Sequence, residues 1–164
     1  MNRHFQLFGL PEQFDIDSAA LDQTYRALAA QFHPDKTAAA SAFEQRQAVM
    51  MASALNEAYR VLNNPIDRAA SLLLDKGIDA DAPEHTAFSP EFLMQQMQWR
   101  ETLAEARADG NEAALAEVAA EAAEARWQLL SDLRDAFERQ DGETAAQLVR
   151  QGRFLDKLVR ESTA

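Results

Sequence analysis

The stretch Gln31-Phe32-His33-Pro34-Asp35-Lys36 stands between two amphipathic helices that are predicted within the first 65 residues. The first helix carries apolar residues at spacings of four, three and four: Leu21, Tyr25, Leu28 and Phe32. The second ends at Asn63-Asn64-Pro65, and its apolar stripe consists of Ala48, Met51, Leu55, Tyr59 and Leu62. Because Pro34 disfavours helical geometry at His33, the first helix has to stop there. We therefore expect an antiparallel helical hairpin with His33-Pro34-Asp35 at its exposed corner.

The three corner residues have side chains suited to binding. Pro34 fixes φ and stiffens the turn, His33 supplies an imidazole, and Asp35 presents a carboxylate that an arginine can bind through two hydrogen bonds. Proline and aspartate are also common in turns, so the tripeptide alone could be ordinary turn composition. The helices on either side favour the binding interpretation.

This stretch, with its flanking helices and the opening Phe5-Gln6-Leu7-Phe8-Gly9-Leu10-Pro11, resembles the J-domain. J-domains stimulate the ATPase of DnaK-type chaperones, so the resemblance implies that the tripeptide binds such a chaperone. J-domains commonly carry a basic face on the helix before the tripeptide. Here that helix offers mainly Arg26, with Asp22 opposing it, so we expect weak charge steering. We expect Arg26 and Lys36 to be secondary contacts with the chaperone. The alternative is that they are ordinary basic residues exposed to solvent.

A second resemblance extends over nearly the whole chain. The segments from Phe92 to Glu101 and from Arg153 to Leu158 look like the C-terminal domain of the HscB family, co-chaperones of bacterial iron–sulfur cluster assembly. The resemblance implies that the N-terminal half engages a chaperone of the HscA type and the C-terminal half a cluster scaffold of the IscU type. It also implies the scaffold-binding residues: Leu93, Met94, Met97, Gln98, Glu101, Glu105 and Phe154. The family often has an acidic residue in place of Gln98, which puts an ion pair there in doubt.

A helical projection of residues 92–106 separates two faces. The expected core face holds Phe92, Trp99, Leu103 and Ala106. The other face holds Leu93, Met94, Met97 and Ala104, and it also carries Glu101 and Glu105. Apolar surface with a polar rim is typical of a protein-binding site, and methionine adapts its shape to a partner. Phe154 falls off the apolar stripe of the last helix and is a candidate companion; core packing over a wide face is the alternative.

The pattern predicts an all-α protein, because alternating strand patterns are missing and helix-favouring residues abound. We expect a J-domain with a bridging helix at residues 1–75, a linker containing His85 at 76–88, and an antiparallel three-helix bundle at 89–164. Ser89-Pro90 is expected to open the first bundle helix, with breaks near Asp109-Gly110-Asn111 and Asp141-Gly142. The stripe of the middle helix is Leu115, Val118, Ala122, Ala125, Leu129, Leu133 and Phe137, and that of the last is Leu148, Gly152, Leu155 and Val159.

Composition disfavours several function classes. A formal net charge of −11 argues against nucleic acid and anionic membranes as partners, and the acidic residues Glu112, Glu117, Glu121 and Glu124 fit a solvated face. Without cysteine, signal peptide or membrane-spanning run, the chain is expected to be a soluble protein of the bacterial cytoplasm. Its three histidines form no metal pair, and phosphate loops and nucleophile arrangements are missing, so we expect no metal, cofactor or catalytic residue.

The sequence thus predicts an adaptor, a monomer with two binding surfaces that tether a client beside a chaperone. Three alternatives stay open. One is a J-domain protein that delivers another client. A second is a helical protein that dimerises through Leu93 and Met97. A carboxylate pair brought together by the fold is the third, and it would make the chain an enzyme.

Overall fold

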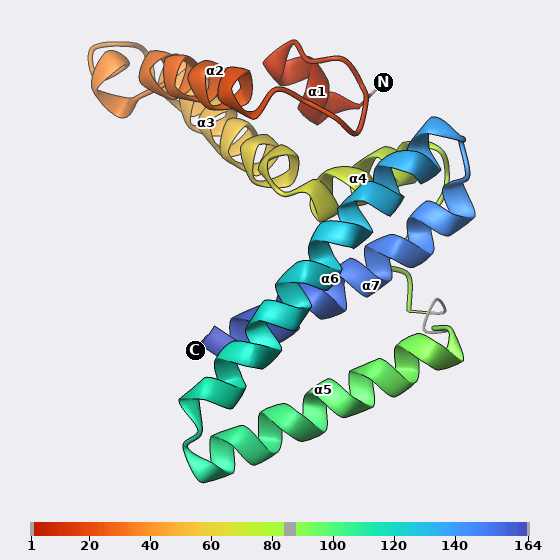
Figure 1. The fold of residues 1–164 in the computed structure, drawn as a ribbon. Helices are drawn as coiled ribbons and strands as arrows, with labels where there is room; N and C mark the ends of the chain where they lie inside the picture. Colours follow the sequence, from red (N-terminus) through yellow and green to blue (C-terminus); the bar gives the residue numbers. More distant parts are fainter. Residues whose placement is uncertain (1, 84–87, 164) are drawn as a thin grey trace. The chain divides into compact units, whose positions relative to one another are not determined.

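The computed structural model describes residues 2–83 and 88–163. These residues form seven α-helices and a short 3-10 turn, with no strand among them, so the predicted all-α class is confirmed (Figure 1). The chain divides into two compact units, Met1–Lys76 and Gly77–Ala164. Residues 84–87 of the expected linker, His85 among them, lie outside the described residues.

The first unit contains four α-helices and the 3-10 turn: α1 (Arg3–Phe8), α2 (Ser18–Gln31), η1 (Pro34–Lys36), α3 (Ala42–Asn63) and α4 (Pro65–Asp75). Polar side chains define where the helices start, because each accepts a hydrogen bond from a backbone N–H of the first turn. The caps of α1, α2, α3 and α4 are Asn2, Asp17, Ser41 and Asn64. The core of this unit gathers Phe5, Leu21, Leu55, Leu62, Ile66 and Leu73, all nearly inaccessible to solvent.

The buried face of α3 is wider than the predicted stripe. Leu55 and Leu62 are buried as expected, and so are Ala58 and Val61, which the stripe did not include. The reason is that α1 and α4 pack on α3 in addition to α2. On α2, by contrast, Leu21 is buried, whereas the other three stripe residues, Tyr25, Leu28 and Phe32, are only half-buried.

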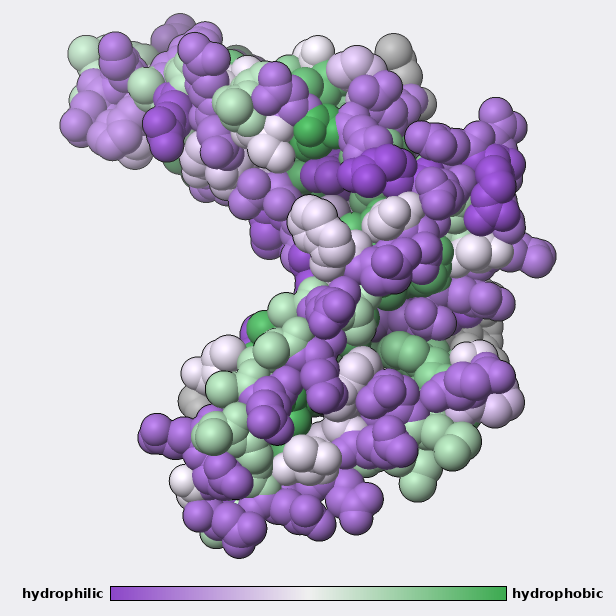
Figure 2. Space-filling model, in the orientation of Figure 1, coloured by the Kyte–Doolittle hydropathy of each residue, from purple (hydrophilic) through white to green (hydrophobic). Residues whose placement is uncertain are grey.

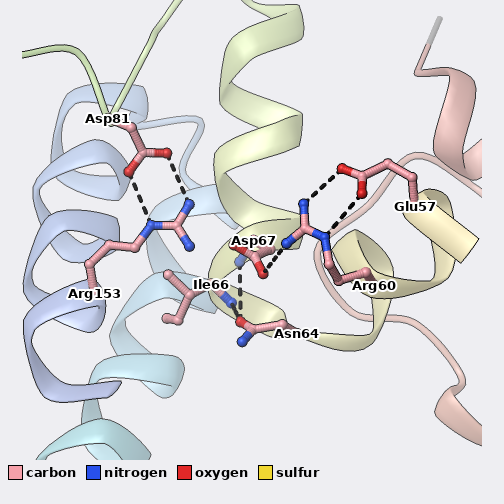
Figure 3. Close-up of polar contacts among 7 residues, drawn as sticks. All are labelled: Glu57, Arg60, Asn64, Ile66, Asp67, Asp81 and Arg153. Atoms are coloured by element: carbon pink, nitrogen blue, oxygen red, sulfur yellow. Dashed lines mark hydrogen bonds and ion pairs between the residues drawn. The ribbon is translucent and has the colours of Figure 1, made fainter. Parts of the chain in front are cut away.

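Two arginines connect the helices of the first unit. Arg68 is buried, and its guanidinium donates to the carbonyls of Phe14 at 2.6 Å and Leu62 at 2.7 Å. Arg60 bridges Glu57 on its own helix and Asp67 on α4, with N···O distances of 2.7 and 3.5 Å (Figure 3). The bonds from Arg68 satisfy carbonyls near the end of α3 and in the loop before α2, which joins three segments around one cation.

The second unit consists of α5 (Pro90–Asp109), α6 (Glu112–Glu138) and α7 (Gly142–Thr163). The predicted helix starts and breaks are observed. Ser89 accepts from the N–H of Phe92 at 3.2 Å with Pro90 in the first turn, and Gly110 ends α5 in the left-handed conformation at φ 63°. The long helices α6 and α7 lie side by side and share most of the core, whose members include Val118, Ala122, Leu129, Leu133, Val149, Leu155 and Leu158 (Figure 1).

Candidate functional site

The predicted corner is an ordered turn. Helix α2 ends at Gln31, and His33 adopts extended backbone at φ −63° and ψ 141°, as the following proline requires. His33 Nδ1 accepts a hydrogen bond from the N–H of Asp35 at 3.2 Å, and Thr37 Oγ1 donates to the Pro34 carbonyl at 3.3 Å. Both bonds hold the peptide unit before Asp35, and the Lys36 N–H, which follows Asp35, donates to the His33 carbonyl at 2.9 Å. The backbone on both sides of Asp35 is therefore held by local hydrogen bonds.

The side chains of the corner are open to solvent. The exposed fraction is 58% for the His33 side chain and 93% for that of Asp35. Nδ1 of His33 lies 3.6 Å from the Asp35 carboxylate and already accepts the hydrogen bond from the N–H of Asp35. Asp35 thus presents a carboxylate that is available to a cation from another molecule.

The hairpin below the corner is cross-linked by two tyrosines. Tyr25 on α2 donates to Asn56 Oδ1 on α3 at 2.7 Å, and Tyr59 on α3 donates to Asp22 Oδ1 on α2 at 2.6 Å. The two rings are stacked with centroids 4.1 Å apart. Asp22, which the sequence suggested only as a charge opposing Arg26, is therefore also a hydrogen-bond acceptor that joins α2 to α3.

The two basic residues predicted as secondary contacts are both exposed. Arg26 lies on α2, four residues after Asp22, and Lys36 lies in η1 directly after Asp35. The loop that follows is tied to α3 by Gln45, whose Nε2 donates to the carbonyls of Ala38 and Ala40, each at 3.2 Å. Lys36 therefore lies next to the corner, whereas Arg26 lies on α2, along the side of the hairpin.

A second candidate surface lies on α5. Leu93, Met94 and Met97 are exposed to 43%, 64% and 70%. The polar residues predicted with them are exposed as well: Gln98, Glu101 and Glu105. We refer to Leu93, Met94, Met97, Gln98, Glu101 and Glu105 as the α5 surface. The face turned inward holds Trp99, Leu103 and Ala106, which are buried, and Phe92, which is half-buried.

Phe154 does not share the exposure of the α5 surface. It is half-buried on α7, and its ring contacts the inward residues of α5: it is edge-on to Phe92 at 5.8 Å and stacked near Trp99 at 6.2 Å between centroids. A projection of α7 alone could not show this, because α5 packs against the side of α7 that carries Phe154. The structure therefore brings Phe154 next to α5, but on its inner side.

Two models of protein families match the chain, one in each unit. The DnaJ domain matches residues 3–70, and the HSCB C-terminal oligomerisation domain matches residues 88–162. A co-chaperone protein HscB homolog of Neisseria meningitidis serogroup C is 63% identical over 161 residues, which cover 98% of this chain and 97% of that relative. The chain belongs to the HscB co-chaperone family.

Other HscB proteins agree in sequence and in fold. The homolog of Bordetella petrii is 48% identical over 162 residues, with 98% of this chain and 94% of that relative covered. The structure of chaperone HscB from Vibrio cholerae matches with a TM-score of 0.85 at 36% identity and covers 99% of this chain and 96% of that one. Human co-chaperone HscB matches with a TM-score of 0.89 at 28% identity, over 98% and 80% of the two chains. The chain is thus an HscB co-chaperone with an N-terminal J-domain.

Sequence reasoning missed two residues next to the α5 surface of this HscB protein. Glu121, assigned to a solvated face, accepts a hydrogen bond from Trp99 Nε1 at 2.9 Å. The guanidinium carbon of Arg100 lies 5.2 Å from the centre of the Phe154 ring. Both contacts cross between helices, so a pattern within one helix holds no signal for them.

Other kinds of site find little support in the described part of this HscB chain. Its described residues contain no group of three histidine or acidic side chains placed to hold a metal ion, and none of the described helices is long and apolar enough to cross a membrane.

A cavity of about 740 Å³ lies among α1, α3 and α4, and its lining includes Leu7, Met51 and Leu74. Neither the corner nor the α5 surface contributes to that lining. On the face drawn in Figure 2, hydrophilic residues predominate.

Proposed function

We propose that this HscB protein stimulates the ATPase of a specialised DnaK-family chaperone of the HscA type and delivers to it an iron–sulfur cluster scaffold of the IscU type. In this way it assists cluster maturation and transfer. The observation that carries the proposal is the Asp35 carboxylate, 93% exposed at a corner whose backbone is held by hydrogen bonds.

The corner suits a contact that changes the partner's catalytic rate. An exposed carboxylate of fixed position can accept two parallel hydrogen bonds from an arginine of the chaperone's ATPase domain. Such a contact orients the partner's own residues and requires no chemistry from His33 or Pro34, which keep Asp35 in place. In this proposal nucleotide hydrolysis takes place in the chaperone, and the co-chaperone is not itself an enzyme.

The α5 surface suits a protein partner with an apolar patch and basic neighbours. Leu93, Met94 and Met97 supply apolar area, and Glu101 and Glu105 supply negative charge beside it. Burying three large apolar side chains supports affinity, whereas the acidic rim supports orientation and association rate. Gln98 is neutral and contributes a hydrogen bond at most.

Tethering explains why both surfaces belong to one chain. A scaffold bound to the α5 surface is held at high local concentration near a chaperone bound to the corner, without any conformational change in the adaptor.

The location in the bacterial cytoplasm stays a prediction from sequence. Self-association through the α5 surface is the competing function, and the description of the matching family model as an oligomerisation domain favours testing it.

The first prediction concerns the corner. Asp35→Asn keeps the shape of the side chain but removes its charge, so it should abolish stimulation of an HscA-type ATPase while scaffold binding stays unchanged. Steady-state hydrolysis and a binding titration measure the two properties. If the wild-type protein leaves the hydrolysis rate of the chaperone unchanged, the proposed function is wrong.

The matched variant is Leu93→Ala with Met97→Ala, which removes apolar area from the α5 surface. It should weaken scaffold binding by at least about tenfold, since a buried Leu or Met contributes roughly 1.5–3 kcal/mol. Stimulation of the chaperone in the absence of scaffold should be unchanged. Loss of both properties in either variant would contradict the two-surface model.

Analytical sedimentation tests the competing hypothesis of self-association. A wild-type protein that sediments as a dimer, and a Met97→Asp variant that sediments as a monomer, would support self-association instead.

A further inference from the structure

The first turns of α3 expose large apolar side chains. Phe43, Val49 and Met50 are exposed to 61%, 66% and 71%. Each of them is three or four residues from Arg46, which is also exposed, so the four side chains are neighbours on one side of the helix. Leu55, on the opposite side, is buried in the core. We refer to Phe43, Arg46, Val49 and Met50 as the α3 outer face.

The α3 outer face begins beside the corner. Turn η1, which contains Asp35, packs against α3. The loop between them is fixed as well, because Gln45 donates from Nε2 to two of its carbonyls, each at 3.2 Å. Phe43 lies in the first turn of α3, and Met50 lies roughly 10 Å farther along the helix axis. A partner bound at the corner therefore has the α3 outer face next to it.

The corner alone is too small for a specific protein interface. Such interfaces commonly bury about 800 Å² on each partner and involve roughly 20–30 residues a side. His33, Pro34 and Asp35 are three residues at the tip of a hairpin. A chaperone that binds them with specificity therefore has to contact further surface of the first unit.

The two helices of the hairpin differ in what they offer for this purpose. The exposed residues of α2 from Gln23 onward are polar or small: Gln23, Arg26, Ala27, Ala30 and Gln31. Among the described residues of the first unit, the large apolar side chains that are exposed lie on the α3 outer face and at Leu74 of α4. Contacts that dominate binding energy are packed and desolvated. The apolar area for such contacts beside the corner therefore lies on α3.

We propose that the α3 outer face binds the same chaperone molecule as the corner, through an apolar contact. Phe43, Val49 and Met50 pack on apolar side chains of the chaperone, and Arg46 among them faces an acidic one. The corner acts on the rate of hydrolysis, whereas the α3 outer face supplies affinity that the sparse positive charge of α2 does not. This inference rests on the proposed stimulation of a chaperone by the corner.

Steady-state hydrolysis by an HscA-type chaperone separates the two contributions. Phe43→Ala with Met50→Ala should raise the concentration needed for half-maximal stimulation at least about tenfold, because apolar area is lost from the contact. Stimulation at saturation should be unchanged, since Asp35 is intact. Phe43→Leu with Met50→Leu keeps apolar side chains and should stay close to wild type.

Leu74→Ala is the matched control, because Leu74 is 59% exposed in the same unit but lies on α4. It should leave the half-maximal concentration unchanged. Thermal unfolding by circular dichroism identifies any variant that fails to fold. Exposed positions of this kind are expected to affect stability little.

Protection of a thiol from alkylation supplies a second measurement. The chain has no cysteine, so Met50→Cys introduces its sole thiol. Saturating chaperone with ATP should slow the reaction of this thiol with a maleimide several-fold. The thiol introduced by Leu74→Cys should react at the same rate with and without chaperone. Mass spectrometry of this chain measures the rate separately from any thiol of the chaperone.

The outcomes separate failure of this inference from failure of the proposed function. An unchanged half-maximal concentration in Phe43→Ala with Met50→Ala would overturn the inference, and so would a Met50→Cys thiol that the chaperone does not protect. An equal effect of Leu74→Ala would also overturn it, because the contact would then not be specific to α3. In each case stimulation by the wild-type protein leaves the proposed function standing. A wild-type protein that does not stimulate the chaperone would overturn the proposed function, and this inference with it.

Discussion

Arg68 shows how one buried cation can hold a small helical unit together. Its side chain donates to the carbonyls of Phe14 and Leu62, and its guanidinium lies 5.2 Å from the centre of the Phe14 ring. Burial lowers the pKa of Arg68, but an arginine stays protonated in any case. The cation remains buried because its hydrogen bonds and the Phe14 ring replace water.

Substitution of this residue gives a prediction at the same scale. Arg68→Met keeps most of the apolar stem but leaves two carbonyls without their donor, so the free energy of unfolding should fall by about 2–3 kcal/mol. Urea unfolding followed by circular dichroism measures the change. Arg46→Met, at an exposed position on α3, is the control and should change the midpoint little. Equal midpoints for the two variants would show that the Arg68 bonds do not stabilise the fold.

At the scale of elements, the hairpin of α2 and α3 depends on polar contacts as well as on packing. Only Leu21 of the described α2 side chains is buried, and Tyr25 and Tyr59 add stacked rings and two hydrogen bonds between the helices. These contacts keep α2 and α3 in register below the corner. The exposed Asp35 therefore extends from two helices that are joined.

The bond between Tyr59 and Asp22 predicts an altered titration. Hydrogen bonding to Asp22 raises the pKa of Tyr59, because the bond requires the protonated phenol. The resulting stability is present below the ordinary pKa of about 10 and is lost as the pH rises through the higher pKa of the folded state. In Tyr25→Phe, tyrosinate absorbance reports Tyr59 alone, since the chain has two tyrosines. Adding Asp22→Ala, which removes the acceptor, should lower the midpoint; an unchanged midpoint would contradict the hydrogen bond.

At the scale of the whole molecule, the two proposed binding surfaces lie in two separate compact units of one chain. The corner belongs to unit Met1–Lys76, and the α5 surface belongs to unit Gly77–Ala164. The proposed function requires that both are occupied together, because local concentration comes only from a covalent connection. Neither surface is expected to depend on the other for its own binding.

Mixing variants tests this requirement. Asp35→Asn retains the α5 surface, and Leu93→Ala with Met97→Ala retains the corner. An equimolar mixture should therefore fail to restore the extra ATPase stimulation that wild-type protein produces when scaffold is added. Steady-state hydrolysis with chaperone and scaffold present measures the effect, and wild type at the same concentration is the control. Recovery of wild-type stimulation by the mixture would show that tethering is not needed.

Local sequence was sufficient for the helices and for the exposed corner. Ser89-Pro90 and Gly110 act within a few residues of themselves, so their effect on α5 could be predicted without knowledge of the fold. The same holds for His33-Pro34, whose backbone preference ends α2. The projection of α5 also predicted that Leu93, Met94 and Met97 would lie apart from Trp99, because helical periodicity alone separates those positions.

Contacts between helices were decided by the tertiary structure. Asp22 and Glu121 were interpreted as charges of exposed faces, and each accepts a hydrogen bond from an aromatic residue of another helix. Phe154 lay off the apolar stripe of its own helix, yet it packs against Phe92 and Trp99. The physical reason is range: caps, turns and helical periodicity act over a few residues, whereas these partners are 22 to 62 residues apart and meet only after the helices have packed.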